Sequence, residues 1–397
     1  VDNAVFDADP GGEANNQLGS MTLELTQPEI SGVTVHTAPE EAADDEADVP
    51  ELVDVATPRS EVAIEDRLIV QFEATGIYGA LVANSSGDVD EIDEGFDRLT
   101  DDGVSTQVLD RYLSTTDEET TVEVVADEDI GNQDALEIDL SASDSDTYLT
   151  IDQANDQFFL IADTSSDDAF ENGDAPDADE DFTATIEYDA DEGDDQYEFE
   201  DTGDRNSHPA PFDATTDTSD NFPYLQQGDV ISGSADLTLA PRSITFDNTN
   251  EDDQIEAPAS EDSEISATTN VAPGSDAELR VTSTDASSSF RQGNDVNITE
   301  DGSITTTYDL SGQEVGDAFD TNFRVEGSGV DSVDSVIVES VGDTGDEETN
   351  ETEPEPEPEP EDDGEANETA DDGGDDGSTD DGTPGFGAVV ALVALIG

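Results

Sequence analysis

Residue types that often carry chemistry are scarce in this chain. Its 397 residues include no cysteine, no lysine and only two histidines. Without cysteine the chain has neither a disulfide framework nor a thiolate-bound metal, and without lysine it has no phosphate-binding P-loop. The residues around His36 and His208 are polar, include proline and form no H-E-x-x-H motif, so we expect both side chains to be solvated.

A serine nucleophile elbow is also missing, since no G-x-S-x-G sequence occurs. Paired carboxylates occur along the whole chain, so such pairs carry no information about a glycosidase-type site. We therefore predict no catalytic residues and no enzyme activity.

Positive charge is nearly absent. Nine arginines stand against 107 acidic residues, which gives a formal net charge of -98. Nothing here neutralises a run of phosphates, so nucleic acid is excluded as a partner. Self-repulsion at this charge is costly in dilute buffer, whereas in molar salt the Debye length falls to about 3 Å and screens most of it. The composition indicates a protein adapted to brine, with general disorder as the competing interpretation.

The C-terminal residues divide into a polar stretch and an apolar one. Residues 342–383 are nearly half Asp and Glu and contain no aromatic residue, Val, Ile, Leu or Met, so we predict a disordered stalk. The alternating Glu and Pro of residues 353–360 favour a polyproline II rod. Residues 386–397 are uncharged but shorter than the roughly twenty residues of a membrane helix. We interpret them as a truncated transmembrane segment, with a short buried helix as the alternative.

The acidic stalk, Pro384-Gly385-Phe386 and the apolar run together resemble the PGF-CTERM sorting tail of haloarchaeal surface proteins, including S-layer glycoproteins. The motif resemblance covers residue 384 onward and lacks the basic cluster that normally follows the apolar run. It implies an extracellular protein at the cell surface, with an archaeosortase and the glycosylation machinery as partners. It also implies a lipid anchor that holds the C-terminus at the membrane, and self-association in a surface lattice that depends on divalent cations.

Alternation of apolar and polar residues predicts a mainly β fold of tandem, immunoglobulin-like β-sandwich domains. Spacings within residues 96–113 also allow one or two short helices, and hence a small α+β unit. In residues 241–341 seven short strands are expected, with a hairpin around Asp301-Gly302. We expect five parts: residues 1–58, an N-terminal β segment and acidic linker; 59–240, one or more β-rich or α+β domains; 241–341, an immunoglobulin-like sandwich; 342–383, the disordered stalk; and 384–397, the sorting motif and membrane segment. The first residue is Val1, so the chain is either a mature form or an excised fragment.

Two acidic clusters offer oxygen ligands for calcium or magnesium. The weak candidates are Asp177, Asp179, Asp181, Asp189 and Asp191. Neither cluster matches an EF-hand loop, and a solvated acidic face with loosely held monovalent cations is the simpler interpretation. We expect no other cofactor.

Four N-glycosylation sequons begin at Asn84, Asn297, Asn350 and Asn367. Chance alone would produce about three in a chain of this composition. Asn350 and Asn367 are favoured because they lie in the stalk, and Asn84 because it lies in a polar turn, whereas Asn297 falls in an expected strand.

Three functions remain open from the sequence. The leading hypothesis is a structural, non-enzymatic surface glycoprotein that builds an S-layer lattice in a halophilic archaeon. The second is a surface adhesin or ligand-binding protein outside the lattice. The third is the C-terminal anchoring part of a secreted hydrolase.

Overall fold

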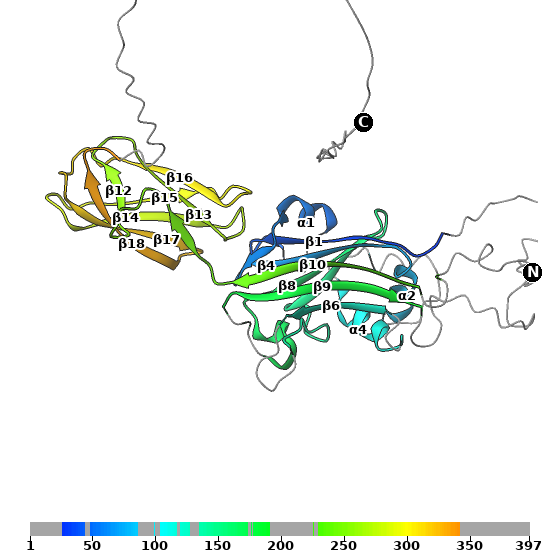
Figure 1. The fold of residues 1–397 in the computed structure, drawn as a ribbon. Helices are drawn as coiled ribbons and strands as arrows, with labels where there is room; N and C mark the ends of the chain where they lie inside the picture. Colours follow the sequence, from blue (N-terminus) through cyan, green and yellow to red (C-terminus); the bar gives the residue numbers. More distant parts are fainter. Residues whose placement is uncertain are drawn as a thin grey trace, which may run out of the picture. The chain divides into compact units, whose positions relative to one another are not determined.

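The computed structural model describes residues 26–43, 48–85, 99, 104–116, 120–127, 135–173, 176, 178–190, 225 and 229–341. These residues form two β-sandwiches, each with its own apolar core (Figure 1). We call residues 26–240 the first sandwich and residues 241–341 the second. The expected stalk, sorting motif and membrane segment lie outside the described residues.

Two sheets form the first sandwich. One has six strands in the order β2-β1-β4-β8-β7-β5, and the other has four in the order β3-β10-β9-β6. The strands are β1 (Ile30–Ala38), β2 (Thr57–Pro58), β3 (Glu61–Ala63), β4 (Arg67–Ala74), β5 (Val104–Ser105), β6 (Thr120–Ala126), β7 (Thr147–Asp152), β8 (Gln157–Asp163), β9 (Glu180–Asp189) and β10 (Val230–Ala240).

The core of the first sandwich follows from period-two alternation. In β9, Phe182, Ala184, Ile186 and Tyr188 are fully buried, and the threonines between them are part-exposed. Facing strands supply similar residues, and the rings of Phe72 in β4 and Phe158 in β8 stack with centroids 5.0 Å apart. Each such ring contributes roughly 1.5–3 kcal/mol by burial.

Short helices close parts of this sandwich. The α1 helix (Val49–Val55) begins at Asp48, whose side chain accepts a hydrogen bond from the Glu51 amide at 3.0 Å. Its buried Leu52 joins Tyr148, Phe159 and other residues on the outer face of the six-stranded sheet. The helices α2 (Tyr78–Asn84) and α4 (Gln107–Leu113) pack on each other and contribute buried residues to the main core (Figure 1). Two 3₁₀ turns, η1 (Asp167–Ala169) and η2 (Glu171–Gly173), follow β8.

The second sandwich has the immunoglobulin-like arrangement. A sheet in the order β11-β13-β16 faces a sheet in the order β12-β18-β17-β14-β15. The first strand of the fold is split, since β11 pairs with β13 while β12 runs parallel to β18 in the other sheet. The strands are β11 (Ile244–Phe246), β12 (Ile255–Pro258), β13 (Ser263–Thr269), β14 (Ala277–Asp285), β15 (Arg291–Val296), β16 (Ser303–Tyr308), β17 (Ala318–Val325) and β18 (Ser328–Val338).

The structure departs from the sequence analysis in three places. Strand β1 pairs with β4 from Ile30 to Ala38, so residues expected in a separate N-terminal segment belong to the first sandwich. The hairpin predicted around Asp301-Gly302 is wrong, because β15 pairs with β14 and β16 pairs with β13 in the opposite sheet. The alternation of apolar and polar residues in 135–140 predicts a strand, but these residues make only isolated bridges to Val125 and Phe170.

Candidate functional site: an arginine-linked junction between the sandwiches

Several residues singled out in the sequence lie outside the described part of the chain. These are Pro384, Gly385 and Phe386 of the sorting motif, the sequon residues Asn350 and Asn367, the cation candidates Asp177 and Asp191, and His208. Asn84, Asn297, Asp179, Asp181, Asp189 and His36 are described.

The described cation candidates do not come together. Asp179 and Asp181 lie at the start of β9 and Asp189 at its end, which places the two groups about 25 Å apart along a strand that rises 3.3 Å per residue. The Asp181 carboxylate accepts a hydrogen bond from the Thr238 hydroxyl at 2.7 Å. Within the described ranges, no three His, Asp or Glu side chains lie close enough to hold one metal ion.

His36 is half-buried, whereas a solvated side chain was expected. It lies in β1, where its Nε2 donates to the Gln71 side chain at 2.9 Å. Burial lowers its pKa, and the hydrogen bond to Gln71 opposes this only partly, so the imidazole is neutral at pH 7. The contact is structural, since Gln71 continues in a row of hydrogen bonds to Gln157 and Asp152.

The described sequons differ in accessibility. Asn84 ends α2, where its Nδ2 donates to the Ala80 carbonyl at 2.9 Å and its backbone carbonyl accepts two hydrogen bonds from Arg111. Asn297 is exposed and directly follows β15 rather than lying within a strand.

The most highly organised polar cluster joins the two sandwiches. Arg59, between β2 and β3, extends its guanidinium into two loops of the second sandwich. It donates to the carbonyls of Asn270, Val271, Thr299 and Glu300 at 3.0–3.2 Å. The planar guanidinium of arginine suits this set of four carbonyls, because its five N–H groups diverge in fixed directions.

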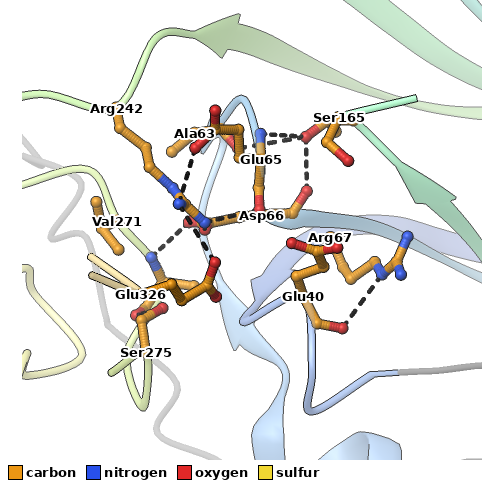
Figure 2. A network of polar contacts seen from close by, with 12 residues as sticks. Glu40, Ala63, Glu65, Asp66, Arg67, Ser165, Arg242, Val271, Ser275 and Glu326 are labelled. Atoms are coloured by element: carbon orange, nitrogen blue, oxygen red, sulfur yellow. Dashed lines mark hydrogen bonds and ion pairs between the residues drawn. The ribbon is translucent and has the colours of Figure 1, made fainter. Parts of the chain in front are cut away.

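A second arginine makes the reciprocal contact. Arg242 begins the second sandwich, and its guanidinium reaches the β3–β4 turn of the first (Figure 2). It donates to the Glu65 carbonyl at 2.7 Å and forms ion pairs with the Asp66 carboxylate at 2.8 Å and the Glu65 carboxylate at 2.9 Å. Glu326 of the second sandwich lies 3.7 Å away.

Asp66 is the centre of the cluster. One carboxylate oxygen accepts from Arg242, and the other accepts from the backbone N–H of Ala272 in the second sandwich at 2.6 Å. The residue is fully buried. Burial raises the pKa of Asp66 to about 6, although Arg242 and the Ala272 amide act to lower it. Burial likewise lowers the pKa of the Arg59 guanidinium. Desolvation is therefore the main cost of the junction, and the multiple hydrogen bonds offset it.

A cleft of about 480 Å³ opens beside the Arg59 contact. Both sandwiches line it, and its lining is polar: Ser60, Glu61, Ser243, Thr245, Thr268, Thr269, Asn270, Glu300 and Asp301 stand around Arg59. An adjoining hollow is lined by Pro273 and residues 297–301. The two share Glu300 and Asp301.

Sequence reasoning missed this junction. The scarcity of arginine was the available signal, since two of nine arginines serve one contact. Their partners stand up to 241 positions away and are mostly backbone carbonyls, which carry no sequence signature.

No helix among the described residues is both long enough and apolar enough to span a bilayer.

Comparison with known proteins finds relatives of one kind. No family model matches the chain. It is 30% identical over 410 residues to a cell surface glycoprotein of Haloferax gibbonsii, covering 97% of this chain and 40% of that protein. It is 28% and 26% identical over 323 residues to cell surface glycoproteins 1 and 2 of Haloarcula hispanica, covering 78% of this chain and 30% of each relative. The chain thus spans less than half the length of these relatives.

Solved structures are more distant. A tetra-tandem repeat from the extending region of a large adhesion protein is 13% identical with a TM-score of 0.19, covering 71% of this chain and 48% of that one. A titin fragment is 10% identical with the same TM-score, covering 70% of this chain and 93% of that one. The fold assignment accordingly rests on the strand topology described above.

Proposed function

We propose that this homologue of haloarchaeal cell surface glycoproteins is itself a structural, non-enzymatic glycoprotein of the cell surface. In this proposal the protein forms part of an S-layer lattice, and its C-terminal tail anchors it to the membrane. The relatives' names support the surface location and the glycoprotein character. The lattice role and the anchor go further and need tests of their own.

The reciprocal arginine contacts are the observation that favours a structural role. A lattice repeats one orientation and one shape of its subunit, so domains that rotate freely relative to each other would prevent regular packing. Arg59 and Arg242 oppose such rotation, because each crosses from one sandwich to the other and donates several hydrogen bonds there.

Net charge indicates how copies of the chain would meet. Two surfaces of the same strongly acidic protein repel one another unless cations lie between them. We therefore expect divalent cations to act between subunits, at faces such as the one that carries Asp179 and Asp181. In that position each subunit would supply only part of the ligand set.

Electron microscopy of the purified chain tests the lattice. In molar salt with calcium or magnesium it should form ordered sheets, and chelation should disperse them. The Arg59→Ala/Arg242→Ala double variant should keep both sandwiches folded but give disordered aggregates or small sheets. A protein that stays monomeric at every salt and cation concentration, and binds a separate surface partner, would show the adhesin alternative to be correct.

Mass spectrometry tests the anchor. Protein extracted from membranes should carry a lipid and lack residues 386–397. An unmodified tail that continues through residues 386–397 would contradict sortase processing.

A further inference from the structure

Asn297 directly follows strand β15 and lies between two buried residues. Its neighbours Val296 and Ile298 are buried in the second sandwich, while Asn297 itself is exposed. No polar contact of its side chain occurs within the part of the chain that the structure describes. The backbone is thus held on both sides while the amide nitrogen remains accessible, as an acceptor requires.

Asn84 lacks this freedom. Its amide nitrogen is bound to the Ala80 carbonyl, and its own carbonyl is held twice by Arg111 at 2.8 and 3.1 Å. Transfer of a sugar to Asn84 in the folded protein would require the end of α2 to open. In the folded state the side chain of Asn297 is thus exposed, whereas that of Asn84 is partly buried and hydrogen-bonded.

The surroundings of Asn297 suit a sugar. Asn297 lines a hollow of about 540 Å³, and Glu300 and Asp301 lie both in this hollow and in the cleft between the sandwiches. Hydroxyl groups line that cleft, and hydroxyls both donate and accept hydrogen bonds, as sugar rings do. Three carboxylates, those of Glu61, Glu300 and Asp301, also line the cleft and would repel an acidic sugar.

We propose that Asn297 carries an N-linked glycan, that the first sugars of this glycan are uncharged, and that they lie in the cleft and contact Ser60 and Glu61 of the first sandwich. The inference rests on the proposed function, since only a protein exposed to the glycosylation machinery is modified. It adds a covalent group to the junction, so that the glycan and the arginines hold the same two domains.

The chemistry requires a glycosyl phosphate donor and a transferase. The Asn297 Nδ2 forms a bond to the anomeric carbon of the donor, and the bond from that carbon to the phosphate oxygen breaks. The phosphate leaves with the bonding electrons, and the amide nitrogen gives one proton to the base of the transferase.

Glycopeptide mapping of protein from a glycosylating haloarchaeal host tests the site. Because the chain has no lysine, trypsin cuts only after arginine and places Asn84 in residues 68–98, Asn297 in residues 292–324, and Asn350 with Asn367 in the peptide that begins at residue 325. We expect a glycan on 292–324 that begins with an uncharged sugar, and an unmodified 68–98. A bare 292–324 with glycans at the stalk overturns this inference alone. Bare peptides throughout would also contradict the glycoprotein assignment.

Hydrogen exchange tests the position of the glycan. Asn297→Gln should accelerate exchange of the Ser60 and Glu61 amides at least threefold and leave the β14 amides unchanged. Thr299→Ser keeps the sequon and should behave as wild type, and Asn84→Gln should not affect the cleft. A glycosylated protein whose Asn297→Gln variant shows unchanged exchange at Ser60 and Glu61 would overturn the placement in the cleft.

Discussion

Replacing Arg59 with alanine tests the junction most directly. The change removes five hydrogen bonds to four carbonyls. The Thr299 and Glu300 residues are exposed, so their carbonyls regain water, whereas Asn270 and Val271 are buried and their carbonyls lose their guanidinium donor. A buried carbonyl without a partner costs about 1–3 kcal/mol. Two such groups give roughly 2–4 kcal/mol, because water entering the emptied space recovers part of the loss.

The Ala272 amide is a reporter of this opening, since it donates to buried Asp66 across the junction. Exchange of that amide requires the sandwiches to separate locally. At 1.4 kcal/mol per factor of ten, Arg59→Ala should accelerate it by roughly 30- to 700-fold. Amides of the second core, such as those in β14, should exchange at the wild-type rate.

Arg111→Ala is the matched control, because Arg111 also donates to a backbone carbonyl but within the first sandwich. It should leave Ala272 exchange unchanged. If Arg59→Ala does not alter exchange at Ala272, or accelerates β14 equally, then Arg59 does not hold the junction and the reasoning is refuted.

Three further predictions concern single residues. Because the pKa of Asp66 is about 6 when folded against 3.8 ordinarily, the folded state binds the proton more tightly. Stability should therefore rise as pH falls from 7 to 4, by about 2 kcal/mol relative to Asp66→Asn, in denaturant titrations at these two pH values. An equal pH dependence in both proteins would contradict this. Burial and nearby Glu171 and Glu123 raise the pKa of Glu137 to about 7. Glu137→Gln should therefore raise the free energy of unfolding at pH 8 by about 1 kcal/mol after allowance for solvent screening, with a higher melting temperature, and have little effect at pH 5. A lower melting temperature at pH 8 would count against it. Gly302 has φ +84°, and a Cβ there would clash with the Thr269 carbonyl oxygen, so Gly302→Ala should destabilise the second sandwich by more than about 2 kcal/mol in calorimetry. Gly312→Ala is the control, because a Cβ at Gly312 meets nothing within 4 Å and should be near neutral. Similar melting of the two variants would show that the turn at Gly302 relaxes.

Local pattern was sufficient to predict most of the strands. The alternation in Phe182–Tyr188 predicts a strand, and this strand is β9, because a strand buried on one face needs an apolar residue at every second position. The second sandwich was predicted as immunoglobulin-like for the same reason, from several short alternating runs.

Pairing was harder to predict than strand position. Asp301-Gly302 provides good turn residues, but a turn does not determine which sheet each flanking strand joins. That choice depends on the whole core, here on β14 and β13 as the neighbours. The split first strand was missed as well, because β12 is only Ile255–Pro258 and too short to show alternation.

The candidate site was the least predictable part. The acidic clusters were conspicuous in the sequence, yet their described members lie at opposite ends of β9. Neither His36 nor Arg59 could be placed, since burial and contacts with backbone carbonyls depend on chain segments far away in sequence. Arg59 illustrates this, with partners 211 to 241 positions later.

The distance in sequence between Arg59 and its carbonyls also orders events during synthesis. When the first sandwich has emerged from the ribosome, the residues whose carbonyls bind Arg59 have not yet been synthesised. The Arg59 guanidinium is therefore hydrated at that stage. Each sandwich can complete its own core first, and closure of the junction comes last, when the pairing of β3 with β10 already holds Arg59 beside the start of the second sandwich. A chain arrested before residue 270 would therefore expose Arg59 and Asp66 to solvent. These two side chains become covered only after translation has supplied Val271 and Glu300.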